Sequence, residues 1–142
     1  MRIRGTSDRK ELQRSTGQQR RLLVVDEELD DLRYISAVLR QQGYEVRSTP
    51  SYLEGATCLE GEDFDLIIVS QGSANFEGRS VLARAIEKDR HTPVLVFARS
   101  VEIGCYLEAM QMGALDYIEK PLPRAEIEDL VAKHLRTPLG NA

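Results

Sequence analysis

The run Leu22-Leu23-Val24-Val25 is short and apolar, as expected for a strand that is covered on both of its faces. Apolar residues then recur at helical spacing from Leu32 to Leu39, and the pattern stops at Gly43, a natural end for a helix. A buried strand followed by an amphipathic helix is the repeating unit of an α/β protein with a parallel sheet.

The same alternation continues through the rest of the chain. Strands are expected at 44–46, 66–69, 94–97 and 115–119, and helices at 51–60, 81–86, 102–112 and after Pro123. Five strands alternating with five helices predict a flavodoxin-like, doubly wound parallel sheet. The expected strand order is 2-1-3-4-5, with run 66–69 at the centre, two helices on one face and three on the other.

Composition and charge bound the class of protein. Of 142 residues, 42% are hydrophobic and 30% are charged, which is typical of a soluble globular domain. No apolar run approaches the roughly 20 residues of a membrane span, and no secretory signal is evident, so a cytoplasmic location is expected. Cys58 and Cys105 have no metal-ligand spacing and are expected to pack on helices as small hydrophobes. His91 and His134 are equally isolated.

Charge is distributed unevenly along the chain. The net charge is −4, but residues 1–21 carry seven basic and two acidic side chains, so the remainder is strongly acidic. An acidic body argues against direct nucleic-acid binding. We therefore expect one folded domain at 21–136, a solvated basic tail at 1–20 and a short C-terminal tail at 137–142. Contact of the basic tail with nucleic acid or an acidic membrane is the alternative.

Charged residues follow two of the expected strands. Asp26 and Glu27 come directly after the first strand, and Lys120 follows the fifth. Carboxyl ends of parallel strands meet at one edge of a sheet, near the point where strand order reverses. Two carboxylates facing an ammonium suit a divalent cation together with a phosphoryl group. The alternative is that each is a solvated loop residue.

With these residues in place, the chain resembles the response-regulator receiver family over residues 21–136. The resemblance rests on four segments in order, 22–27, 64–69, 92–96 and 112–121. It implies that the acid pair binds Mg²⁺ and that an aspartate ending the third strand takes phosphate from a partner's phosphohistidine. It also implies that a Thr or Ser ending the fourth strand and the lysine read the phosphate, while an aromatic three residues before the lysine changes rotamer.

The functional positions of the family are only partly kept. The acceptor position, eight residues before Gly78, holds Ser70, and the switch hydroxyl is replaced by Ala98. Lys120 and the switch aromatic, Tyr117, are present. Because a serine hydroxyl is neutral, it is a poorer Mg²⁺ ligand than a carboxylate and needs a base before it can attack phosphorus.

We therefore expect no aspartyl phosphorylation, at most weak Mg²⁺ binding by Asp26 and Glu27, and no other cofactor. Lys120 is expected to form a structural ion pair with Asp26 or Glu27, with anion binding as the alternative. Arg99, beside Ala98, is expected to be a solvated loop residue, and the alternative is a second cation in the vacated pocket.

The function favoured by the sequence is that of a stand-alone receiver, not an enzyme, that signals by protein contact. Its partner face is expected on helix 102–112, strand 115–119 and the last helix, with Tyr106, Met110 and Tyr117 partly exposed. For Met110 we favour core packing instead. Candidate partners are a histidine kinase, an effector or another receiver, including a second copy in a homodimer. Only six residues follow Arg136, so the output is expected to come from another protein.

Two alternatives stay open. In the first, Ser70 accepts phosphate from a kinase. In the second, the chain is a small flavodoxin-like enzyme or nucleotide binder. Against the latter, residues 26–31 are largely acidic and contain no glycine-rich phosphate loop.

Overall fold

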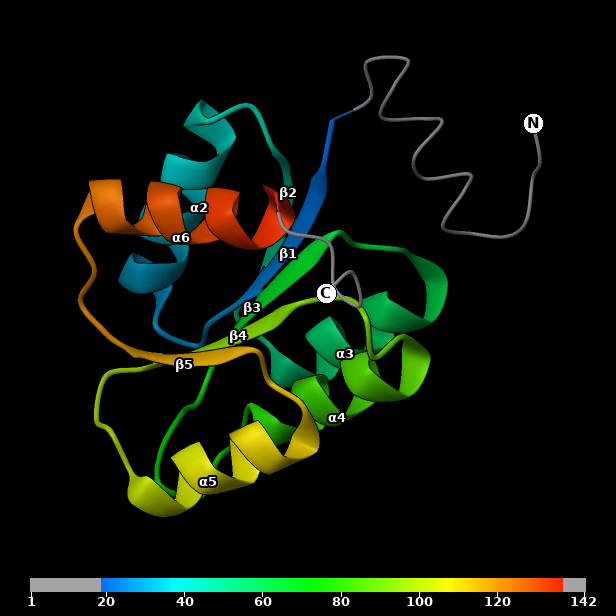
Figure 1. Ribbon diagram of the computed structural model, residues 1–142, viewed down its shortest axis with the longest axis vertical. Helices are drawn as coiled ribbons and strands as arrows, with labels where there is room; N and C mark the ends of the chain where they lie inside the picture. The colour runs from blue at the N-terminus through cyan, green and yellow to red at the C-terminus, as the bar shows by residue number, and fades with distance from the viewer. Residues whose placement is uncertain (1–18, 137–142) are drawn as a thin grey trace.

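Five parallel strands form one sheet in the computed structural model, which describes residues 19–136 (Figure 1). The strands are β1 (Arg21–Val25), β2 (Glu45–Thr49), β3 (Leu66–Ser70), β4 (Val94–Ala98) and β5 (Asp116–Glu119). Their order is β2-β1-β3-β4-β5, which confirms the predicted topology with β3 at the centre. Of the tails predicted at 1–20 and 137–142, residues 1–18 and 137–142 lie outside the described residues.

Five helices within residues 19–136 cover the two faces of the sheet. They are α2 (Leu29–Gln41), α3 (Tyr52–Gly61), α4 (Arg79–Lys88), α5 (Ile103–Met112) and α6 (Arg124–Arg136). Figure 1 shows α2 and α6 on one face and α3, α4 and α5 on the other. The predicted division of two helices and three helices is therefore confirmed.

The core consists of two layers because alternate side chains of each strand point to opposite faces. Every residue of β3 and β4 is buried, as expected for central parallel strands. The layer under α3, α4 and α5 contains Leu23, Val25, Ile67, Val69 and Val96, whereas the layer under α2 and α6 contains Leu22, Val24, Leu66, Ile68 and Phe97. The edge strand β2 alternates between exposed and partly buried residues before its buried last residue, which explains its weaker signal in the sequence.

Helix α5 contacts the sheet through small side chains. Its buried residues are Cys105 and Ala109, and it ends at Gly113, whose φ of +117° is readily adopted only by glycine. The next residue after Ala109, Met110, turns outward and is 36% exposed. The expectation that Met110 packs in the core is therefore wrong. Successive helical residues differ by 100° in direction, so Met110 cannot share the face of Ala109.

Candidate functional site

The carboxyl ends of β1, β3 and β5 bring together three predicted site residues. Asp26, Ser70 and Lys120 are respectively 2%, 4% and 5% exposed. Polar side chains are rarely this deeply buried unless they have partners. The strand-end site is defined here as these three residues with Asp31 and Tyr52.

Lys120 is held between two carboxylates. Its Nζ lies 2.9 Å from Asp26 Oδ2 and 2.8 Å from Asp31 Oδ2. The other oxygen of Asp26 accepts a hydrogen bond from the backbone N–H of Glu28 at 3.0 Å. Lys120 thus forms an ion pair with Asp26, one of its two predicted partners. Its second partner is Asp31, which the sequence did not single out, whereas Glu27 is exposed.

The two carboxylates respond differently to their surroundings. Burial raises the pKa of Asp26 even though Lys120 and the Glu28 N–H favour its charged form. Partial burial acts to raise the pKa of Asp31, but hydrogen bonds from Lys120 and Arg99 outweigh it, so the pKa is lowered overall. Asp31 is therefore the more firmly ionised of the two.

Arg99 lies at the rim of the strand-end site. Its guanidinium group is paired with Asp31, while 56% of its side chain remains exposed. It is neither a lone solvated residue nor a second cation inside the pocket. Asp31 is shared by Arg99 and Lys120, so the acids and bases of this site satisfy one another without an added anion.

Among the hydrogen bonds of residues 19–136, none joins the Ser70 hydroxyl to a carboxylate that could act as its base. The buried hydroxyl of Tyr52 lies beside it, and burial raises the pKa of that phenol well above its usual value, so Tyr52 stays protonated. Asp26 is engaged by Lys120. Glu77 accepts hydrogen bonds from the backbone N–H and the hydroxyl of Ser73, which lower its pKa.

The loop after β3 passes very close to Ser70. A Cβ atom added to Gly78 would lie 2.1 Å from the carbonyl oxygen of Ser70, so any larger residue would displace the backbone. Gly78, from which Ser70 was predicted to be the acceptor position, therefore also sets the local packing around Ser70.

The other two predicted residues lie beside this site. Ala98 is fully buried at the end of β4 and has no hydroxyl group to offer a phosphoryl oxygen. Tyr117 is half-buried, and its hydroxyl donates to the side-chain carbonyl of Gln71. Gln71, Asp31 and Tyr52 were missed from the sequence. Two of them had a readable signal, since Gln71 directly follows Ser70 and Tyr52 lies just after a strand end.

Weak divalent-metal binding remains a prediction. Within residues 19–136, no group of three or more His, Cys, Asp or Glu side chains is placed to hold a metal. Asp26 already accepts from Lys120 and Glu28, so its oxygens would have to exchange partners.

We expect Mg²⁺ to bind with a Kd above about 1 mM, measured by amide chemical shifts at Asp26 and Glu27. The matched control is Ser70→Asp, which restores a carboxylate and should bind Mg²⁺ more tightly. Saturation of the wild type well below millimolar would show that another group supplies the missing ligand.

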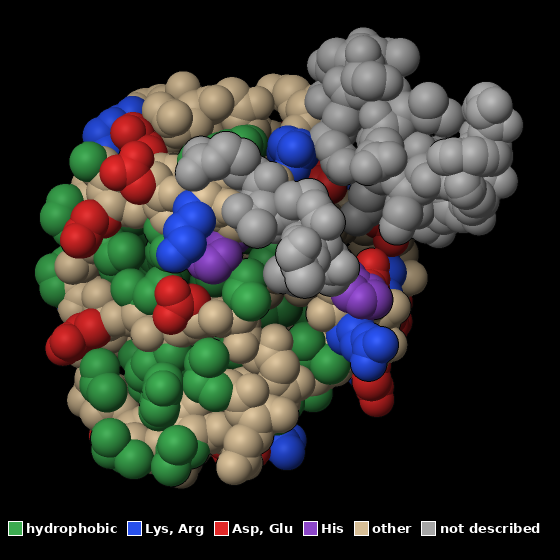
Figure 2. All heavy atoms as spheres, viewed as in Figure 1, with side chains coloured by type: hydrophobic (Ala, Val, Ile, Leu, Met, Phe, Trp, Pro, Cys, Tyr) green, Lys and Arg blue, Asp and Glu red, His purple; other side chains and the backbone are tan. Residues whose placement is uncertain are grey.

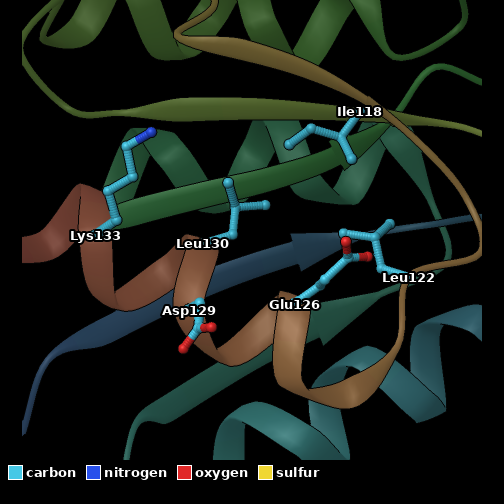
Figure 3. A pocket seen from close by; sticks show the side chains of 6 residues that line it. All are labelled: Ile118, Leu122, Glu126, Asp129, Leu130 and Lys133. Carbon is cyan, nitrogen blue, oxygen red and sulfur yellow. The ribbon is translucent and has the colours of Figure 1, made fainter.

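A separate groove lies between β5 and α6. It has a volume of about 310 Å³ and is lined by Ile118, Leu122, Glu126, Asp129, Leu130 and Lys133. In Figure 3, Ile118 of β5 and Leu130 of α6 project into it, so its interior is apolar with charged side chains around it. No residue of the strand-end site lines this groove.

Exposed apolar side chains gather on α5 and the residues just before it (Figure 2). The α5 face is defined as Val101, Ile103, Tyr106, Leu107 and Met110, which are between 36% and 69% exposed. Two predicted partner residues, Tyr106 and Met110, belong to it, and Tyr106 packs edge-on against the ring of Tyr117. Tyr117 itself is half-buried, so it is partly exposed as expected.

The fold and the strand-end acids define a signalling module of the receiver type. The sequence profile of the response regulator receiver domain matches residues 22–132, and the chain belongs to this family. The chain is 30% identical over 107 residues to the transcriptional regulatory protein ZraR of Klebsiella oxytoca, covering 75% of this chain and 24% of that protein. It is also 30% identical over 114 residues to the two-component response regulator-like APRR5 of Arabidopsis thaliana, covering 78% and 20%. The chain thus spans about a quarter of the length of these relatives.

Solved structures show the same fold. A CheY-like receiver domain protein from Methanospirillum hungatei has a TM-score of 0.79 at 23% identity, covering 84% of this chain and 95% of that one. A response regulator from Burkholderia pseudomallei, solved with a phosphorylated aspartic acid, calcium and citrate, has a TM-score of 0.70 at 24% identity, covering 80% and 65%. Among the described helices, none combines the length and apolar character that a membrane crossing requires.

Proposed function

We propose that this receiver domain signals by protein contact without accepting phosphate on an aspartate. The observation that supports this most directly is Ser70, the residue predicted at the acceptor position, which is 4% exposed and lies beside the Tyr52 hydroxyl. A neutral hydroxyl in that position lacks the charge that makes a carboxylate both ligand and nucleophile.

The groups around Ser70 support the same proposal. Lys120, the cation that would neutralise a phosphoryl group, already makes short contacts with two carboxylates. Ala98 offers no hydrogen bond to a phosphoryl oxygen. A phosphate arriving here would meet an occupied lysine, a missing hydroxyl and two acids, so both the transfer and its detection are disfavoured.

The α5 face and the groove between β5 and α6 are the surfaces proposed for partner contact. Ile103 is 69% exposed and Leu107 is 50% exposed, and with the other apolar side chains of the α5 face they form an exposed apolar patch of the kind that marks interaction sites. A histidine kinase, an effector, another receiver or a second copy of this chain are the partners proposed. In this role the domain is a signalling module rather than an enzyme, acting in the cytoplasm.

The test is chemical. After incubation with Mg²⁺ and acetyl phosphate or a phosphohistidine donor, the intact mass of the wild-type protein should not change, because an acyl phosphate requires a carboxylate at the acceptor position. Intact-mass spectrometry measures this directly, and a typical receiver treated in parallel shows that the donor is active.

Ser70→Asp serves as the matched variant. It should gain Mg²⁺ affinity and become slowly phosphorylated, without full switching, since Ala98 still lacks a hydroxyl. Stoichiometric, hydroxylamine-sensitive labelling of the wild type would contradict the proposal. A hydroxylamine-resistant phosphate on Ser70 would instead support the alternative in which a kinase modifies this serine.

A further inference from the structure

Gln71 is a completely buried polar residue with every hydrogen-bonding group in use. Its backbone N–H donates to the Phe97 carbonyl at 2.8 Å, which extends the pairing of β3 with β4. Its side-chain amide donates to the carbonyl of Ser100 at 3.1 Å and lies 3.4 Å from the carbonyls of Gly72 and Ser73. The amide therefore joins the loop after β3 to the loop between β4 and α5.

The side-chain carbonyl of Gln71 continues this link to β5. It accepts a hydrogen bond from the Tyr117 hydroxyl, whose oxygen in turn accepts from the backbone N–H of Glu102 at 3.2 Å. Glu102 is the residue that precedes α5, and its own side chain caps no N–H of that helix. Burial raises the pKa of Tyr117, so its hydroxyl remains a donor at neutral pH.

This chain of hydrogen bonds ends at the backbone where the α5 face begins. Glu102 stands between Val101 and Ile103, which are 45% and 69% exposed. A second contact, from the Cys105 thiol to the Ala74 carbonyl at 3.5 Å, ties α5 to the loop after β3. The groups that form the link, a side-chain amide, a hydroxyl and a backbone N–H, are uncharged, and none of them belongs to the strand-end site.

We infer that Gln71 is a positioning residue that, through Tyr117, permanently holds the loop between β4 and α5 and so presents the α5 face in one arrangement. This inference rests on the proposed function, in which the α5 face contacts a partner without phosphorylation. The Gln71 side-chain amide would then connect β3 to that face in place of a phosphate. In this arrangement the domain is ready for its partner at all times.

The test uses backbone amide hydrogen exchange of the whole chain, followed by NMR, and needs no partner. Tyr117→Phe removes one oxygen and keeps the ring, and Gln71→Met keeps the side-chain length without the amide. Each should speed exchange at Glu102 by roughly tenfold, the amount expected for loss of one hydrogen bond. Because both residues act through one link, the double variant should exchange no faster than the faster single variant.

The matched control is Tyr34→Phe, which removes another tyrosine-to-backbone bond, from the Tyr34 hydroxyl to the Leu122 carbonyl at 3.0 Å. It should leave exchange at Glu102 unchanged. Unchanged exchange in Tyr117→Phe, or additive effects in the double variant, would overturn the inference. Should Gln71→Met fail to fold, Tyr117→Phe alone decides. Acyl phosphorylation of the wild type would refute the proposed function but would leave these exchange rates as they are.

Discussion

Replacing Lys120 with methionine is expected to lower the free energy of unfolding by about 3–5 kcal/mol at neutral pH, the usual cost of removing one partner from a buried ion pair. Methionine preserves most of the side-chain volume, so the loss reflects charge rather than packing. Asp26, which is 2% exposed, would keep a negative charge with only the Glu28 N–H beside it. Urea or thermal unfolding measures the difference.

The loss should depend on pH with a definite sign. In the variant, the pKa of Asp26 in the folded protein rises further above its unfolded value, because burial is no longer opposed by Lys120. A carboxyl group with a raised folded pKa stabilises the protein below its unfolded pKa, and that stabilisation is lost as pH rises through the folded pKa. The deficit relative to the wild type should therefore shrink on acidification.

Two further variants make this result interpretable. Lys133→Met removes an exposed lysine from α6 and should change stability by less than about 0.5 kcal/mol. Adding Asp26→Asn to Lys120→Met should recover part of the lost stability, since no buried charge remains at Asp26. A loss below about 1 kcal/mol in Lys120→Met, within the range of an exposed ion pair, would show that the pair is effectively solvated.

Partner capture should fall by at least about thirtyfold when Leu107 on the α5 face is changed to aspartate, since a central apolar anchor at an interface contributes about 2 kcal/mol or more. Leu107 is 50% exposed, so the change should leave folding intact. Quantitative mass spectrometry of proteins captured from the native cell by wild type and variant measures the effect.

The control for this experiment is Leu53→Asp. Leu53 is 79% exposed on α3, away from the α5 face. Its replacement by aspartate introduces the same charge as Leu107→Asp. A protein whose capture falls with both variants binds the wild type through nonspecific apolar contact rather than through the α5 face. A partner lost only with Leu53→Asp would move the contact surface to α3 and contradict the proposal for α5.

The fold could be predicted from the sequence because its strongest signals are local. Wholly apolar runs such as Leu66–Val69 can be central strands only if both faces are covered, and glycines such as Gly113 end helices through their own conformational freedom. Met110 was assigned wrongly because apolar character alone does not tell which side of a helix faces the sheet.

The candidate site was only partly predictable, because several of its interactions join distant parts of the chain. Asp26, Ser70 and Lys120 could be placed from the strand ends. Asp31 lies on the first turn of α2, where an acid is usually explained by the helix dipole, so its contact with Lys120 had no distinct local signal. Gln71 depends on Tyr117, 46 residues away, for its role.

The double engagement of Lys120 also bears on how such a domain evolves. A single change that restored aspartate at Ser70 would place a third acid near a lysine that Asp26 and Asp31 already share. Without a bound cation, the added charge would face repulsion, and Ala98 would still leave any new phosphate undetected. Selection would therefore have to favour several substitutions together before phosphorylation gave an advantage. Under the proposed function, the replacement of the acceptor aspartate by Ser70 is therefore difficult to reverse in small steps.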